Sequence, residues 1–200
     1  MPPLIPALLG SYLLGSIPTA YLMVKRLKGV DVRTVGSGNV GATNVTRIAG
    51  FRAGVVVFLI DAAKGLLAVL VIAPWALRPM TPTAQLACGI AAVVGHAFSV
   101  FLKFQGGKGV ATTIGVLLGA MPLLAAACLA VWVACFLIWK YVSVASLAAA
   151  VTLPVAQAVA RRPLPELVLG SALALLIVAR HRANIQRLLA GTEHRAGQKR

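Results

Sequence analysis

The chain has 200 residues, of which 60% are hydrophobic and only 12% are charged. This composition excludes an ordinary water-soluble domain of the same length and predicts that lipid surrounds most of the chain. Nineteen Lys and Arg residues against four acids leave a formal net charge of +15, which favours anionic partners. Nucleic acid is not a predicted partner, because the basic residues form short blocks between apolar runs without an RNA-binding signature.

Seven apolar runs predict membrane-spanning helices, because several approach the roughly 20 residues that cross the hydrocarbon. The stretch 110–139 is too long for one span, and Pro122 marks a break in it, since proline removes an amide donor and restrains the preceding residue. The runs cover residues 4–24, 55–77, 85–102, 110–120, 122–139, 143–160 and 165–180. The predicted fold is therefore an all-α integral membrane protein, a compact bundle of about seven transmembrane helices in one domain over residues 1–200.

The basic residues are distributed unequally between the two membrane sides. Connections after the odd-numbered runs carry fifteen Lys and Arg, those after the even-numbered runs carry three, and Lys64 lies inside the second run. By the positive-inside rule, this bias predicts an N-terminus outside and a cytoplasmic C-terminus. The predicted cytoplasmic segments are 25–54, 103–109, 140–146 and 180–200.

The first cytoplasmic connection contains a polar, glycine-rich stretch over residues 36–47. Small residues there expose backbone amides, and the side chains add further donors, so the loop can cradle a phosphate. A flexible linker is the alternative, but linkers rarely combine three glycines with two asparagines and an arginine. The candidate residues are Ser37, Asn39, Thr43, Asn44 and Arg47.

The second cytoplasmic connection places Gly106, Gly107 and Lys108 before an apolar helix that starts at Val110. Free amides at a helix start, their partial positive charge and a flexible lysine together form an anion site. The spacing differs from the Walker pattern. A plain positive-inside loop is the alternative, and the paired glycines favour phosphate binding.

The third and fourth connections add weaker candidates. Serines in membrane helices usually bond their own backbone, and a basic cluster after a last span is usually an orientation signal. All four segments together, however, place donors on one membrane face. These candidates are Ser143 and Ser146 in the third segment and His181, Arg182 and Asn184 in the fourth.

Charged and ionisable residues also occur inside the apolar runs. Asp61 and Lys64 are three residues apart, hence on one helix face, where they form a structural pair or reach the site. For His96, at the end of the third run, a structural hydrogen bond is favoured over catalysis. The three cysteines all lie within apolar runs without metal-ligand spacing, so no metal site is predicted.

The residue patterns over 36–44, 95–112, 141–146 and 180–185 closely resemble the bacterial acyl-phosphate:glycerol-3-phosphate acyltransferases, the PlsY family. The likeness runs from about Gly15 to Glu193 and includes the segments 61–65 and 188–193. One departure is Gln105, which stands where a basic residue is common. It leaves Gly106, Gly107 and Lys108 unchanged.

The resemblance implies an enzyme of the bacterial inner membrane with its active site on the cytoplasmic side. It would transfer a fatty acyl group from acyl phosphate to the sn-1 hydroxyl of glycerol 3-phosphate, the first acylation of phospholipid synthesis. Implied partners are both substrates, membrane lipids and an enzyme that produces acyl phosphate. The resemblance places His181, Asn184 and Ser37 in catalytic roles, the other motif residues at the phosphates, and Asp61, Lys64, His96 and Glu193 in support.

No cofactor is expected, because acyl phosphate is already activated and phosphate is a good leaving group, so that positioning and charge neutralisation can supply most of the rate. No Ser–His–Asp order and no cysteine beside a base is present. We therefore expect direct attack by the glycerol hydroxyl, with a substrate phosphate or His181 accepting its proton. A transporter for organic phosphates and a non-catalytic membrane subunit are the alternatives.

Overall fold

The structure is a computed structural model that describes residues 4–197, and the described residues are helical without any β-strand. The chain divides into two compact units, Met1–Ala120 and Met121–Arg200. The boundary coincides with the helix break expected at Pro122, since one helix ends at Ala120 and the next begins at Pro122. The single domain expected over residues 1–200 stays a prediction.

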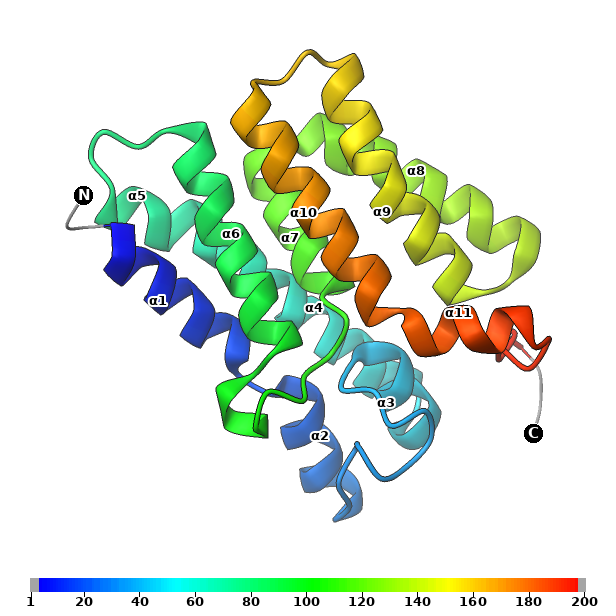
Figure 1. Cartoon of the computed structure of the whole chain (residues 1–200). Helices are drawn as coiled ribbons and strands as arrows, with labels where there is room; N and C mark the ends of the chain where they lie inside the picture. The colour runs from blue at the N-terminus through cyan, green and yellow to red at the C-terminus, as the bar shows by residue number, and fades with distance from the viewer. Residues whose placement is uncertain (1–3, 198–200) are drawn as a thin grey trace. The chain divides into compact units, whose positions relative to one another are not determined.

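The first unit contains most of the helical elements, which Figure 1 shows in blue to green. Helix α1 packs against α6, and α4 packs against both α3 and α7. The approach of α4 to α7 requires small residues, because a Cβ at Gly65 would overlap the Thr112 carbonyl and one at Gly115 would overlap the Ala62 carbonyl. The elements are α1 (Leu4–Ser16), α2 (Thr19–Lys28), α3 (Ala42–Ala49), α4 (Phe51–Leu67), the π-helix η1 (Ala68–Ile72), α5 (Ala73–Ala76), α6 (Pro82–Ala97), the 3₁₀ turn η2 (Val100–Leu102) and α7 (Val110–Ala120).

The N-terminal apolar run, expected as one helix over 4–24, is interrupted between Ser16 and Thr19. Pro18 causes the interruption, because it lacks an amide hydrogen and disfavours helical geometry at Ile17. Helix α2 then continues to Lys28 and ends at Gly29, whose φ of 71° is left-handed. Because the helix is interrupted here, the Ile17 carbonyl accepts a hydrogen bond from the buried Lys64 ammonium.

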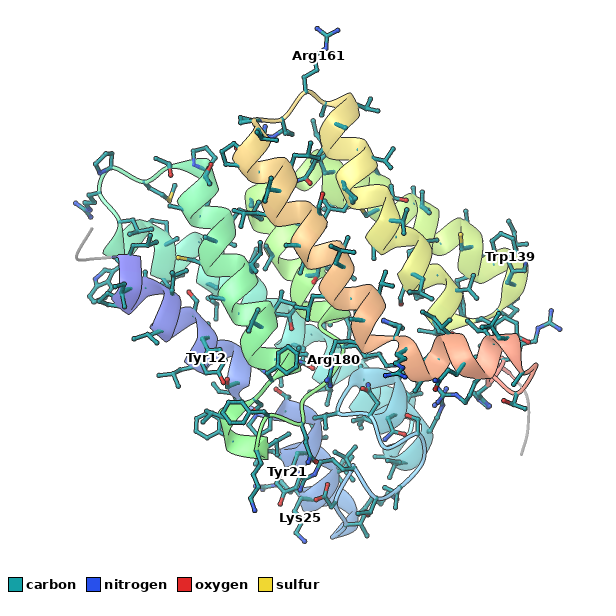
Figure 2. The ribbon with its side chains drawn as sticks, in the orientation of Figure 1. Tyr12, Tyr21, Lys25, Trp139, Arg161 and Arg180 are labelled. Carbon is teal, nitrogen blue, oxygen red and sulfur yellow. The ribbon has the colours of Figure 1, made fainter. Side chains whose placement is uncertain are left out.

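The second unit consists of α8 (Pro122–Trp139), α9 (Val142–Val159), α10 (Leu164–Arg180) and α11 (Arg182–Leu189). Helix α9 packs against both α8 and α10. Polar contacts fix the turn between α9 and α10: Gln157 Nε2 donates to the Glu166 carbonyl at 3.1 Å, and Arg162 Nε donates to Glu166 Oε2 at 2.8 Å. Arg161 projects outward from the same turn (Figure 2).

Five helical segments of the described chain are long and apolar enough to cross a membrane: Leu4–Lys28, Phe51–Ala76, Pro82–Leu102, Pro122–Trp139 and Val142–Val159. The pair α10 and α11, bent by 56°, is a sixth candidate, whereas α7 is shorter than a full span. Large apolar side chains such as Trp75, Leu123 and Val159 are at least 80% exposed, as expected for surfaces that contact lipid. The all-α membrane fold is confirmed; the count of seven spans and the orientation stay predictions.

Candidate active site

The first motif is a loop organised by one buried side chain, Asn44 on α3. Asn44 Oδ1 accepts from the Ser37 amide at 2.8 Å, and Nδ2 donates to the carbonyls of Val32 and Val35, both at 3.1 Å. The side chain is fully buried. These bonds use its donors and its acceptor within the loop, so Asn44 supports the loop. Its contact with a phosphate stays a prediction.

The remaining first-motif candidates are more accessible. Ser37, Thr43 and Arg47 are exposed, and Asn39 is partly buried. Thr43 and Arg47 are four residues apart on α3, so they lie on one helix face. This face presents a hydroxyl and a guanidinium together, and those groups suit a phosphate.

The second motif packs against the C-terminal end of α6. The Gly107 amide donates to the His96 carbonyl at 3.0 Å, and the Gly106 amide donates to the Ala97 carbonyl at 3.2 Å. A Cβ at Gly107 would overlap His96 Nε2 and the Val40 carbonyl. The absence of side chains at Gly106 and Gly107 therefore lets the loop approach α6 and the first motif. The phosphate contacts of the two glycines stay predictions.

The groups of the second motif that suit an anion lie at the start of α7. Lys108 is partly buried, Gly109 has a φ of 82°, and the helix begins at Val110. The first amides of a helix have no acceptor within it and carry a partial positive charge. In the described part of the chain, the buried hydroxyls of Thr112 and Thr113 have no hydrogen-bond partner. Charge and donors thus gather at this helix start.

A buried ionic cluster lies beside the two motifs. Lys64 Nζ is 2.6 Å from Asp61 Oδ1 and also donates to the Ile17 carbonyl, while His96 Nδ1 is 3.8 Å from the same Asp61 oxygen. Asp61 and Lys64 are at most 3% exposed. A cavity of about 10 Å³, the size for roughly one water molecule, is lined by Asp61, His96, Val40 and Gly106 among others. This structural pair connects the interruption at Pro18 to both motifs.

In the second unit, Glu193 joins the third and fourth motifs. Its Oε1 accepts from Ser143 Oγ at 2.9 Å and from Asn184 Nδ2 at 2.7 Å, and its Oε2 accepts from Arg187 Nε at 2.7 Å. Nearby, the Ala196 amide donates to the Lys140 carbonyl at 2.8 Å. Ser143 and Asn184 are thus oriented by the same carboxylate. The phosphate contact of Ser143 stays a prediction.

We expect the stability of this segment to depend on the ionisation of Glu193. Burial opposes its charge, but hydrogen bonds from Asn184, Arg187 and Ser143 outweigh burial and lower the pKa of the carboxyl. Because the unfolded chain then binds more protons than the native one, the stabilisation is complete above the unfolded pKa of about 4.3 and is lost as pH falls through the lower native pKa.

The measurement is the free energy of unfolding in detergent between pH 7 and pH 3. Glu193→Gln should lower it at neutral pH and lose part of its acid dependence. An acid dependence identical to that of the parent protein would contradict the assignment. Glu166→Gln, which alters a carboxylate at the α9–α10 turn of the same unit, is the matched control.

Three further candidate residues of this unit have different surroundings. Ser146 Oγ donates to the Val142 carbonyl at 2.8 Å and accepts from Trp132 Nε1 at 3.2 Å. Its contact with a phosphate stays a prediction. His181 is 2% exposed, and its Nδ1 is 2.8 Å from the Ile177 carbonyl. Because a carbonyl only accepts, Nδ1 carries a hydrogen and donates in this contact. Arg182 is exposed at the start of α11.

Within each unit, the structure brings predicted residues together. Asp61, His96 and Gly106 line one small cavity in the first unit, and Ser143, Asn184 and Glu193 meet in the second. Sequence reasoning missed the Ile17 carbonyl and Arg187. Arg187 is three residues after Asn184 on α11, and this helical spacing could have identified it. Residues 4–197 contain no cluster of three His, Cys, Asp or Glu that could hold a metal ion.

Comparison with known proteins gives the family. The family model described as glycerol-3-phosphate acyltransferase matches residues 5–191. The glycerol-3-phosphate acyltransferase of Myxococcus xanthus is 50% identical over 184 residues, which cover 92% of this chain and 95% of the relative. That of Geotalea daltonii is 45% identical over 187 residues, 94% of each chain. This chain belongs to the glycerol-3-phosphate acyltransferase family.

Solved structures of this family confirm the resemblance to PlsY. A crystal structure of PlsY, an integral membrane glycerol 3-phosphate acyltransferase, in its glycerol 3-phosphate form has a TM-score of 0.89 and 42% identity, covering 97% of this chain and 96% of that one. The lysophosphatidic acid form of PlsY has a TM-score of 0.86 at the same identity. The acyltransferase fold therefore extends over nearly the whole chain, and the chain is a multi-pass membrane protein.

Proposed function

We propose that this acyltransferase transfers a fatty acyl group from acyl phosphate to the sn-1 hydroxyl of glycerol 3-phosphate, releasing lysophosphatidic acid and inorganic phosphate. The observation that carries the proposal is the 42% identity, over 97% of the chain, to PlsY structures in glycerol 3-phosphate and lysophosphatidic acid forms. Acyl phosphate is the proposed donor because the candidate residues suit two phosphorylated substrates, with cationic groups and amides rather than a covalent nucleophile. An enzyme that makes acyl phosphate is the corresponding partner.

The phosphate contacts are assigned to the groups that the structure leaves accessible or charged. Thr43 and Arg47 share one exposed face of α3, and Lys108 with the first amides of α7 supplies a second cationic set. Arg182 adds a guanidinium at the start of α11. Ser37 stays a proposed catalytic residue, held by the bond from its amide to Asn44. Helix amides and cations of this kind stabilise charge that develops on a leaving phosphate.

The proposed reaction has one chemical stage. The glycerol hydroxyl oxygen forms a bond to the acyl carbonyl carbon, the bond from that carbon to the phosphate oxygen breaks, and phosphate departs with the bonding electrons. The hydroxyl proton passes to His181 Nε2 or to a substrate phosphate. His181 is oriented by its Nδ1 contact with the Ile177 carbonyl, while Asn184 is proposed to orient the reacting groups.

The test uses purified protein with acyl-labelled acyl phosphate, with and without glycerol 3-phosphate. We expect lysophosphatidic acid and phosphate in equal amounts when both substrates are present. We also expect unlabelled protein when glycerol 3-phosphate is omitted and the sample is denatured for mass spectrometry. A stoichiometric acyl adduct on a serine that later yields product would overturn direct transfer, and vesicle uptake of glycerol 3-phosphate without acylation would indicate a transporter.

We further propose that the enzyme lies in the bacterial inner membrane with its site on the cytoplasmic side, as the distribution of Lys and Arg indicates. In a background without the native cysteines, single cysteines at Thr34, Gln105 and Ala190 should react with an impermeant thiol reagent only from the cytoplasm. A cysteine at Met80 should react only from outside. These four positions are exposed, whereas a side chain at Gly106 would overlap the His96 carbonyl. Outside labelling at Gln105 would refute the orientation.

A further inference from the structure

A groove separate from the catalytic candidates lies between α2 and η2 in the first unit. Its volume is about 360 Å³, and its lining is mainly apolar, from Pro18, Tyr21, Leu22, Phe101 and Leu102, with Arg33 as the charged member. Leu22 is 53% exposed and Phe101 is 60% exposed. The groove is therefore open on an apolar side, where a lipid acyl chain can lie.

Cationic residues lie close in sequence to the lining of this groove. Lys25 and Arg26 follow Tyr21 and Leu22 by four residues, so each lies one helical turn further along the same face of α2. Lys103 follows Leu102 directly. With Arg33 these residues supply four positive charges against the single carboxylate of Asp31. Apolar lining residues are thus followed by cations, just as the acyl chain of an anionic lipid is followed by its charged headgroup.

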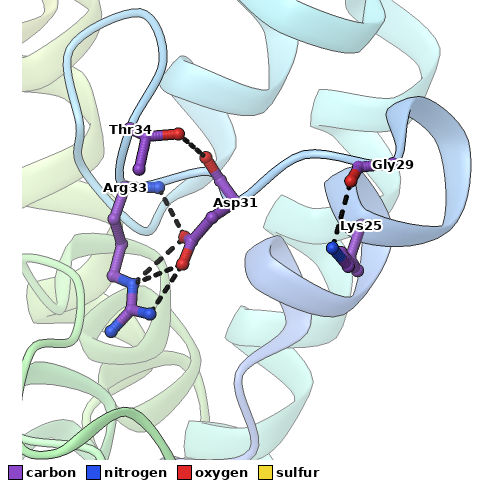
Figure 3. A network of polar contacts seen from close by, with 5 residues as sticks. All are labelled: Lys25, Gly29, Asp31, Arg33 and Thr34. Carbon is purple, nitrogen blue, oxygen red and sulfur yellow. Dashed lines mark hydrogen bonds and ion pairs between the residues drawn. The ribbon is translucent and has the colours of Figure 1, made fainter.

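Arg33 is held in place by the loop that follows α2 (Figure 3). Asp31 accepts from Arg33 Nε at 3.1 Å and from Nη2 at 2.6 Å, and also from the Arg33 amide at 2.9 Å. The guanidinium lies 5.8 Å from the centre of the Tyr21 ring. These contacts use Nε and Nη2, so the Nη1 edge with its two N–H groups is available to bind a phosphate oxygen. The loop thus fixes one cation at the groove.

The segment that follows η2, on the second side of the groove, has an uncommon backbone conformation. Lys103 and Phe104 have φ values of 53° and 63°, two successive left-handed residues that are not glycine. The Phe104 amide donates to the Ser99 carbonyl at 2.8 Å, which stabilises this turn. Such strain persists where the surrounding structure enforces it and is concentrated at functional segments. Here it places exposed Phe101, Lys103 and Phe104 together, a combination suited to the membrane interface.

We propose that this groove binds one anionic phospholipid, with an acyl chain along Leu22 and Phe101 and its phosphate at Arg33, Lys25 and Lys103. Charge complementarity selects this occupant, because the net positive border favours a lipid with net negative charge over a zwitterionic one. The acyl phosphate substrate is assigned elsewhere, to the start of α7. The proposal does not rest on the catalytic assignment, because binding can be measured without turnover.

The experiment measures lipid retention by native mass spectrometry. The detergent-purified full chain is titrated with phosphatidylglycerol or with phosphatidylcholine of identical acyl chains. We expect one phosphatidylglycerol to bind preferentially. The double variant Lys25→Gln/Lys103→Gln should bind it about 30-fold more weakly, because each cation near an anionic headgroup contributes about fivefold to binding. The matched control is Arg52→Gln, which removes an exposed cation on the first turn of α4, outside the groove.

A second variant tests the apolar wall. Phe101→Ser should weaken binding of both lipids, and a photoreactive residue at Leu22 should cross-link to phosphatidylglycerol. Thermal unfolding of each variant verifies folding, since Lys25 also donates to the Gly29 carbonyl at 3.1 Å. Equal binding of the two lipids, equal weakening by Arg52→Gln, or displacement of phosphatidylglycerol by one equivalent of acyl phosphate would overturn the proposal.

Discussion

Replacement of Lys108 by alanine should lower kcat/KM at least about 100-fold, because a charge that neutralises a phosphate in the transition state is typically worth about 3 kcal/mol. Lys108 precedes α7, whose first amides add partial positive charge at the same place. Both contributions become stronger as negative charge accumulates on the departing phosphate. We therefore expect kcat to decrease more than KM increases.

Kinetics with both substrates varied provide the measurement. Lys108→Arg should recover part of the activity if charge is required, and incompletely, because a guanidinium differs from a compact ammonium in shape. Arg52→Ala, which removes an exposed cation from α4, is the charge-matched control and should retain activity close to that of the parent. Near-normal kcat/KM for Lys108→Ala would remove this residue from the active site.

Replacement of Asp61 by asparagine should produce the largest loss of stability, about 3–5 kcal/mol, because it leaves the Lys64 ammonium buried without a compensating charge. The two side chains are 2.6 Å apart, at most 4% exposed, and in contact with the Ile17 carbonyl through Lys64. The loss should extend to activity, since His96 lies near Asp61 and packs against Gly107.

The double variant Asp61→Leu/Lys64→Met separates charge from packing. Removal of both ions should restore most of the stability lost in Asp61→Asn, since a buried pair contributes little net stability compared with apolar residues of similar size. Thermal and denaturant unfolding in one detergent provide the comparison. If Asp61→Asn unfolds like the parent protein, the pair is not a buried structural element.

Sequence alone predicted the membrane class, because long apolar runs form helices that satisfy their own backbone hydrogen bonds within hydrocarbon. It also predicted the helix break at Pro122, where proline chemistry is local. The glycine-rich and basic connections could be recognised because residue type and spacing encode the availability of amides and charge. The interruption at Pro18 was equally local, but it was overlooked within an otherwise apolar run.

Tertiary structure decided which polar groups bond to distant parts of the protein. Asn44 and Ser143 have suitable chemistry for phosphate, yet their partners are a loop backbone and Glu193, fifty residues after Ser143. The glycines of the second motif serve close packing against α6, a contact that no local pattern encodes. A side chain can satisfy either a distant protein partner or a ligand, and only folding determines which partner reaches it. Residue type therefore determined which chemical groups this acyltransferase has. Long-range packing determined which of those groups bond to other parts of the protein.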